Sequence, residues 1–245
     1  MNSKMVKWTR ERLIDSLKYL IFRLDTTKFI LDKPHFDYQP IPWKGINEAR
    51  LRGKASFLRW QEIRYHIDDN YISLKDLGCC VGYFPISAST EYAINSIGID
   101  CNSKYLRIAE YATPTELIGN CNFINLKIDE DNVSILPETD ITLCLSIWHH
   151  WVFEYGIEKA SNILQNIWNK TNNVIFFESG EEEVKDEFDL PFDDSRPAKK
   201  WLTDYLQRTC NNSKVEIIGE FAAGEYPHYK IKNHKRSLFK VKRDD

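Results

Sequence analysis

The nine residues Asp76-Leu-Gly-Cys-Cys-Val-Gly-Tyr-Phe84 decide the fold of this chain. They follow a short apolar run and precede an apolar stretch that can be helical, which predicts a strand, a turn and a helix in that order. Gly78 allows a backbone angle that a side chain would resist, and Gly82 lets a ligand approach the next helix closely. Pro85 suits the first turn of that helix, where its missing N–H would have had no partner. The stretch therefore predicts a nucleotide-type binding turn, here called the glycine turn (residues 78–82).

A second acidic residue follows at the end of the next predicted strand, Gly98-Ile-Asp100. In doubly wound sheets the ligand lies beyond the carboxyl ends of the strands, where an acid ending strand two can bind ribose hydroxyls. Asp100 is placed to do this. The G-x-G-x-x-G spacing of dinucleotide enzymes is absent, which disfavours a dinucleotide-dependent oxidoreductase.

The pattern D-x-G-x-C-x-G resembles motif I of the class I S-adenosylmethionine-dependent methyltransferases. The resemblance implies that Asp76 lies near the amino-acid part of S-adenosyl-L-methionine and that Asp100 holds its ribose. It implies that Gly78 and Gly82 pass under the ribose and methionine portions, and that S-adenosyl-L-homocysteine is the product. Cys80 departs from the family, which usually has Gly there but tolerates other small residues.

The resemblance also implies cofactor contacts outside the glycine turn. Tyr83 and Phe84 follow the turn directly, and Ser146 lies at the end of the predicted strand four. Family members often contact adenine just after strand three, where Ile128 and Asp129 are the matching candidates. Glu130 and Asp131 leave that register open.

The rest of the chain offers strands where this family needs them. Strands three to seven are expected at residues 123–128, 141–147, 173–178, 214–219 and 236–241, after a first strand at 71–76. The predicted fold is α/β, a Rossmann-like three-layer sandwich with a seven-stranded, mostly parallel sheet, an antiparallel last strand and an N-terminal helical extension. Residues 71–245 would form the cofactor-binding domain, and residues 1–70 an N-terminal segment that covers the acceptor.

Composition fits one enzyme domain. The chain has 245 residues, of which 42% are hydrophobic and 28% charged, and a formal charge of −3. No apolar run reaches the length of a membrane span. The six cysteines show no metal-ligand spacing, so we expect no metal site, reduced thiols and a cytoplasmic location. A site built from His149, His150, His228 and His234 has no supporting spacing either.

Three segments outside the glycine turn carry notable charge or aromatic content. Residues 8–24 are basic and amphipathic, and residues 38–43 are rich in Pro and aromatics. Residues 54–64 can form a helix that carries Arg59 and Arg64, and Arg50 and Arg52 lie just before it. These arginines either meet a carboxylate or phosphate of the acceptor or are ordinary surface charges. An acidic loop at 181–194 and a basic C-terminus are expected to be solvated, with phosphate contact by the C-terminus as the alternative.

The chemistry is expected after strand four, in Ser146-Ile-Trp-His-His-Trp151. Transfer to a hydroxyl needs a base, and a histidine with a pKa of roughly 6.5 is largely neutral near pH 7. In an extended loop adjacent side chains point opposite ways, so at most one histidine would face the acceptor, and His150 is preferred to His149. A purely structural role for both stays open. Glu178, at the end of strand five, is a further candidate for the acceptor side.

These features predict a methyltransferase acting on a hydroxyl of a sugar, glycan or small metabolite. The Asn-Pro-Pro-Tyr type of sequence that amino-methylating nucleic-acid enzymes carry after strand four is absent, which argues against base nitrogens as acceptors. RNA methylation at a ribose or terminal phosphate is the second hypothesis, with the basic residues as a phosphate track. A cofactor-binding partner subunit without catalysis is the third.

Overall fold

The structure is a computed structural model that describes residues 53–114, 117, 119–223 and 234–244, together with residues 13, 14, 16, 17, 20, 39 and 40. Most of the predicted segments at 8–24 and 38–43 lie outside these residues, as do Arg50, Arg52, His228, Lys230 and Lys232. No helix in the described ranges is both long and apolar enough to cross a membrane.

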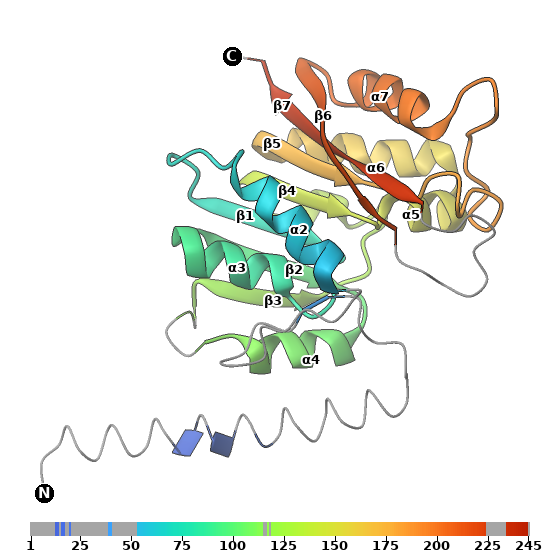
Figure 1. The fold of residues 1–245 in the computed structure, drawn as a ribbon. Coiled ribbons are helices and arrows are strands. Elements are labelled where there is room, and N and C mark those ends of the chain that lie inside the picture. Colours follow the sequence, from blue (N-terminus) through green and yellow to red (C-terminus); the bar gives the residue numbers. More distant parts are fainter. Residues whose placement is uncertain are drawn as a thin grey trace, which may run out of the picture.

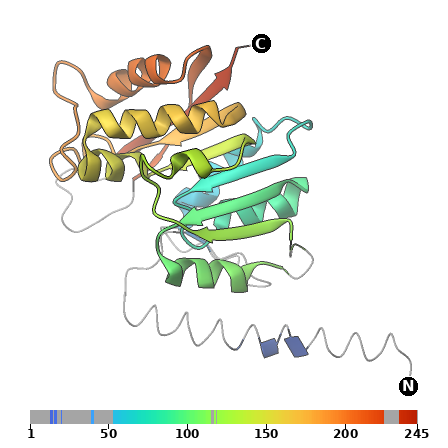
Figure 2. The ribbon, with the colours of Figure 1, turned by 180° about the vertical axis from the view of Figure 1, so that it is seen from behind.

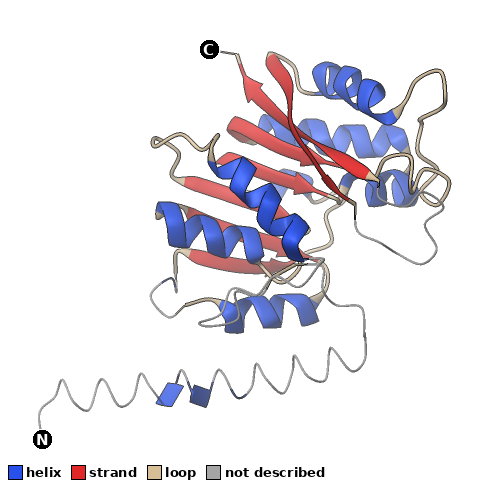
Figure 3. Cartoon of the chain, viewed as in Figure 1, coloured by secondary structure: helices blue, strands red, loops and turns tan. Residues whose placement is uncertain are grey.

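In the described part of the chain, seven strands form one sheet in the order β3-β2-β1-β4-β5-β7-β6. The strands are β1 (Ser73–Leu77), β2 (Asn95–Asp100), β3 (Cys121–Asn125), β4 (Thr139–Leu145), β5 (Thr171–Glu178), β6 (Ser213–Ala222) and β7 (Lys235–Arg243). Neighbours from β3 to β5 pair in parallel, whereas β7 pairs antiparallel with both β5 and β6. Figure 3 shows this sheet between the helices. The predicted fold class is confirmed.

Helices cover both faces of the sheet. Figure 1 shows α2 (Gly53–Arg64) and α3 (Tyr83–Tyr92) in front of the sheet, with α4 (Ser103–Ala112) beside the edge strand β3. Figure 2 shows the other face, covered by α5 (Trp148–Tyr155), α6 (Ile157–Asn169) and α7 (Ala198–Thr209). A short 3₁₀ turn, η2 (Val133–Ile135), leads into β4. The molecule therefore has the expected three layers.

The two faces of the sheet bury separate apolar cores. On the α2 side, Trp60 and Ile63 pack with Leu74 and Phe176, so part of the predicted N-terminal segment belongs to the core of the sheet. On the other side, α5, α6 and α7 pack on Phe177 and its neighbours. Burying each large apolar side chain contributes roughly 1.5–3 kcal/mol. These two cores fix the carboxyl edge of the sheet, where β1 and β4 end side by side.

One buried charge in the central strand was not foreseen. Lys75 is fully buried, and its Nζ donates to Thr139 Oγ1 at 3.0 Å and to the Lys170 carbonyl oxygen at 2.7 Å. Burial is the main reason that the pKa of Lys75 falls to about 7. The ammonium lies at the amino edge of the sheet, away from the glycine turn, and ties β1 to the start of β4 and β5.

The glycine turn leaves no room for a side chain at Gly82. Its φ is +78°, and an added Cβ would lie 2.8 Å from the Ala109 Cβ and from the Phe123 ring. We predict that Gly82→Ala lowers the free energy of unfolding by about 2–5 kcal/mol, since left-handed strain and overpacking add. Gly119→Ala is the control: its φ is +97°, but its Cβ would meet nothing within 4 Å, so it should cost only about 1–2 kcal/mol. Urea unfolding measures both, and equal losses would contradict this packing.

Candidate active site

The glycine turn is held closed by the end of β2. The amides of Gly78 and Cys79 both donate to the Ile99 carbonyl, at 2.8 and 3.0 Å. The Asp100 carboxylate accepts from the Cys80 amide at 2.9 Å and from the Asn102 amide at 2.8 Å. Asp100 therefore lies at the turn, as predicted, and supports its backbone directly.

Cys80 occupies a backbone conformation that favours glycine. Its φ is +51°, between Gly78 at +75° and Gly82 at +78°. The turn therefore keeps its shape with Cys at this position, at a cost on the order of 1–2 kcal/mol. The side chain offsets part of this cost because it is buried against Val81 and Ile108.

Asp76 is an acid buried under the turn. Its residue is 1% exposed, and its Oδ2 is one of two buried side-chain atoms in the described residues that lack a hydrogen-bond partner, the other being Nε2 of His234. Burial, and then the negative charge of Asp100, raise the pKa of Asp76 well above its usual range. An unpartnered buried acid of this kind is costly unless a ligand completes it.

A pocket opens beside the turn at the ends of β1, β4 and β5. Its walls include Arg59, Asp76, Gly78, Phe84, Ser146 and Glu178. The lining brings together residues from α2, the turn, α3 and the ends of three strands. Four of the predicted site residues (Asp76, Gly78, Phe84 and Ser146) and the candidate Glu178 thus share one pocket.

Arg59 and Glu178 form a buried ion pair in this pocket. The Arg59 Nε and Nη2 donate to the two oxygens of Glu178 at 2.5 and 3.0 Å, and Nη2 also reaches the Ala222 carbonyl at 3.1 Å. Two parallel bonds of this kind fix the orientation of both groups. Arg59 stood among the arginines noted in the sequence, but its partner lies 119 residues away and left no local trace.

The network continues across the sheet. Ser146, in a strained conformation with φ +61°, donates through Oγ to Glu178 and accepts from Arg236 Nη1 at 3.1 Å. Arg236 in turn pairs with Glu183 at 2.6 Å. Positive and negative side chains alternate along this series, with the Ser146 hydroxyl between Glu178 and Arg236, so the buried charges compensate one another. Arg236 and Glu183 were missed as site residues.

The expectation of a solvated acidic loop is therefore wrong at two positions. Glu181 and Glu183 are 4% and 7% exposed. The expected solvated C-terminal hairpin is likewise wrong at Arg236, which is 5% exposed. Each of these charges is buried because an opposite charge or a backbone amide meets it in the fold.

The two histidines lie on a helix, which corrects the expectation of an extended loop. α5 begins at Trp148, and the two imidazole rings lie side by side with centroids 4.4 Å apart, both against Phe188. His149 is buried, and its Nδ1 accepts from the Gly180 amide at 2.9 Å. Burial, followed by Arg236, lowers the pKa of both rings, so both are neutral at pH 7. His150 is the more exposed of the two.

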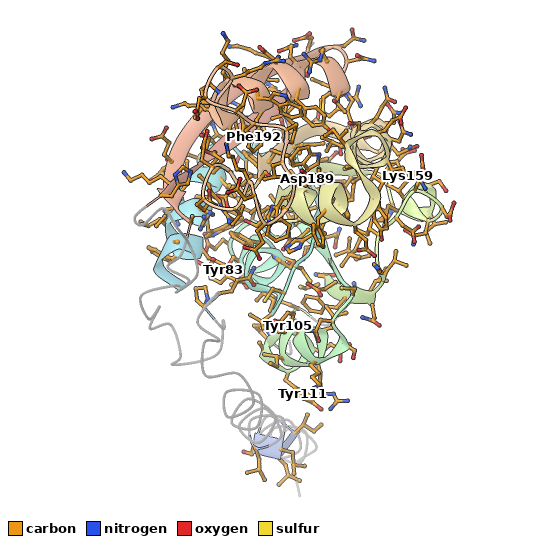
Figure 4. The ribbon with its side chains drawn as sticks, turned by 90° about the vertical axis from the view of Figure 1, so that its right-hand side faces the viewer. Tyr83, Tyr105, Tyr111, Lys159, Asp189 and Phe192 are labelled. Carbon is orange, nitrogen blue, oxygen red and sulfur yellow. The ribbon has the colours of Figure 1, made fainter. Side chains whose placement is uncertain are left out.

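The remaining predicted residues lie at the start of α3 and after β3. Tyr83 begins α3 and stacks edge to face with Phe84 at 5.3 Å; Figure 4 shows it above Tyr105 of α4. Ile128 is buried in the core after β3. Asp129 accepts from the Asn132 and Asp131 amides and shapes the loop there. The loop between β5 and α7, with Asp189 and Phe192 labelled in Figure 4, covers α5.

Comparison with known proteins agrees with this geometry at the level of fold. No protein-family model matches the sequence, and no curated protein matches it. A crystal structure of WbdD superposes with a TM-score of 0.62 at 20% identity, covering 87% of this chain and 46% of that one. WbdD is described as a bifunctional kinase-methyltransferase. The chain thus spans about half the length of WbdD.

Two shorter structures match over nearly their whole length. Magnesium protoporphyrin IX methyltransferase (ChlM) from Synechocystis PCC 6803, crystallised with SAH, has a TM-score of 0.57 at 14% identity, covering 93% of this chain and 99% of that one. A SAM-dependent methyltransferase from Archaeoglobus fulgidus has a TM-score of 0.50 at 16% identity, with coverage of 78% and 96%. The chain has the fold of the class I S-adenosylmethionine-dependent methyltransferases.

The Arg59–Glu178 pair should dominate the stability of the pocket. We predict that Arg59→Met lowers the free energy of unfolding by about 3–5 kcal/mol, because it leaves Glu178 buried without its cation. Arg64→Met, in the same helix, removes a solvent-exposed pair with Glu91 at 3.4 Å and should cost far less. Urea unfolding of the two variants tests this, and similar losses would refute a dominant buried pair.

Proposed function

We propose that this chain binds S-adenosyl-L-methionine and transfers its methyl group to a hydroxyl of a sugar, glycan or small metabolite. The observation that carries the proposal is the unpartnered Oδ2 of Asp76, buried beside a glycine turn in the fold of this enzyme class. An ammonium group is a suitable partner for that oxygen, and the amino-acid end of the cofactor supplies one. We assign the ribose to the turn and Asp100, whose carboxylate lies at the turn.

The charges of the pocket support this choice of ligand. Asp76 and Glu178 contribute two carboxylates and Arg59 one guanidinium, a net charge of −1 when all three are ionised. S-adenosylmethionine has a sulfonium, an ammonium and a carboxylate, which give a net charge of +1. Transfer of the methyl group removes the sulfonium charge, so the product has one positive charge fewer than the cofactor.

We further propose His150 as the base. The acceptor oxygen attacks the methyl carbon, the carbon–sulfur bond breaks with its electron pair going to sulfur, and the acceptor proton passes to the imidazole. The lowered pKa of His150 keeps its ring neutral and able to accept this proton. His149 is the positioning residue, because its Nδ1 is already used by the Gly180 amide. Glu178 acts in the pocket through Arg59 and Ser146 rather than on the acceptor proton.

The two alternatives from the sequence gain no particular support from the described residues. Of the basic positions offered as an RNA track, Arg59 and Arg236 are buried in ion pairs, and Lys240 contacts Glu216 at 3.4 Å. A non-catalytic partner subunit rested on Cys80, and the turn keeps its conformation there. The hydroxyl acceptor therefore stays our proposal.

Cofactor binding should be coupled to proton release. Burial raises the pKa of Asp76, and a cationic ammonium favours its carboxylate form, so binding expels a proton. We predict that affinity for S-adenosylmethionine falls as the pH is lowered below this raised pKa. Calorimetry in buffers of different ionisation enthalpy measures the proton directly.

The Asp76→Asn variant should bind about 10- to 100-fold more weakly, as expected for loss of a charged hydrogen bond, and without this pH dependence. Asp69→Asn, at an exposed position before β1, is the control and should behave as the parent protein. Unchanged binding of S-adenosylmethionine by Asp76→Asn would contradict the proposed site.

Catalysis should depend on His150 far more than cofactor binding does. With an acceptor found by screening sugars and then RNA for S-adenosylhomocysteine release, His150→Gln should lower kcat about 10²- to 10⁴-fold at unchanged cofactor affinity. The parent rate should rise with pH through the lowered pKa of His150 and then level off. A variant with normal kcat would exclude His150 as the base. Binding of acceptor that weakens steeply with salt would favour RNA over a small acceptor.

A further inference from the structure

Three consecutive glutamates after β5 converge on one histidine at the start of β7. The Nε2 of His234 lies 3.4, 3.7 and 3.3 Å from the Oε2 atoms of Glu181, Glu182 and Glu183. This nitrogen is buried and has no hydrogen-bond partner. The glutamates and the histidine are 51 to 53 residues apart in sequence (234 − 183 and 234 − 181), so the sequence spacing gave no indication of the cluster.

The other oxygen of each carboxylate is already held by the protein. Glu181 Oε1 accepts from the Ser237 amide at 2.6 Å, and Glu182 Oε1 accepts from the Ala198 amide at 2.7 Å. Glu183 Oε1 accepts from Arg236 Nε at 2.6 Å. These contacts turn all three Oε2 atoms toward the imidazole. Outer hydrogen bonds that orient carboxylates in this way are characteristic of metal sites.

The three carboxylate oxygens lie farther from the imidazole nitrogen than direct hydrogen bonds require. The distances from His234 Nε2 to the carboxylate oxygens are longer than the usual range of about 2.7–3.2 Å for N–H···O hydrogen bonds. All three carboxylates face His234, Glu183 also pairs with Arg236, and Lys199 is engaged by Glu220. With a neutral imidazole the group has an excess of two negative charges, which a divalent cation balances and one proton does not.

We propose that His234, Glu181 and Glu182 bind a divalent transition-metal ion, with zinc as the best match. Their candidate ligand atoms all lie within 4.8 Å of one another. A tetrahedral ion with bonds of about 2.0–2.2 Å separates its ligands by about 3.3–3.6 Å, close to the observed 3.4 and 3.7 Å. The mixed imidazole and carboxylate set suits zinc better than magnesium or calcium, which prefer oxygen alone.

The ion would link the loop after β5 to the start of β7. Glu183 directly follows Glu182 in the chain and pairs with Arg236. Arg236 in turn donates to Ser146, which lines the pocket. The site would therefore position one wall of the pocket without contacting the cofactor. Binding of the ion does not depend on methyl transfer, so the proposal stands or falls separately from the proposed function.

Zinc titration of the full-length protein tests the site. The Cys101→Ser background removes the exposed thiol, since the other five cysteines are buried. After EDTA treatment and dialysis, calorimetry should show one zinc ion per chain, a raised melting temperature and much weaker binding of magnesium. Cobalt should give the intense visible absorption of a tetrahedral site. His234→Gln should weaken zinc binding at least 10-fold.

His66→Gln is the matched control, because His66 faces a single carboxylate, Glu62, also at 3.4 Å. It should bind zinc as the parent does. If His234→Gln folds poorly, Glu182→Gln gives the second test, since its amide oxygen can still accept from Ala198 while the metal-facing oxygen is lost. Absence of zinc binding, equal binding by His234→Gln, or stability that responds to pH but not to zinc would overturn the proposal in favour of a protonated histidine only.

Discussion

The hydrogen bond from the Cys80 amide to the Asp100 carboxylate is the contact on which the rest of the site depends. It joins the end of β2 to the turn after β1, at 2.9 Å, and so fixes the left-handed backbone at three nearby positions. Burial, and then the negative charge of this carboxylate, raise the pKa of Asp76. A turn shaped in this way leaves a buried acid facing a pocket, which is the feature that a cationic ligand can exploit.

Buried charge extends from this turn across the sheet. One continuous series of contacts runs from α2 to β7 through Arg59, Glu178, Ser146, Arg236 and Glu183. Each buried charge is tolerated because its neighbour compensates it. Removal of any one charge would leave its partner buried without an opposite charge. The network joins segments that are far apart in sequence, and it ends at the glutamate and histidine cluster beside β7.

Local patterns were sufficient for the architecture and for the residues of the turn. Consecutive residues form the strand, the glycine turn and the helix, so a local pattern predicts them. Asp100 could be found because it ends the next strand. The ion pairs could not be found in this way. Arg59 and Glu178, like Glu183 and Arg236, meet only through the tertiary fold, and a single sequence contains no trace of their pairing.

The error at the histidines has a local cause. The segment from Trp148 to Tyr155 is rich in aromatic residues, which have weak helix propensity, so the sequence favoured an extended loop. In the fold, Trp148 and Trp151 are buried in the core, and the Trp148 indole donates to the Tyr205 hydroxyl at 3.0 Å. Tertiary packing outweighs the local preference and places both histidines in the first turn of α5.

A crystal structure of the chain with S-adenosylhomocysteine would test the central claim most directly. We predict that the ammonium of the ligand lies within hydrogen-bond distance of Asp76 Oδ2 and that the ribose hydroxyls reach Asp100. Ligand bound elsewhere, or no binding at saturating ligand, would contradict the cofactor site that we assign to the glycine turn.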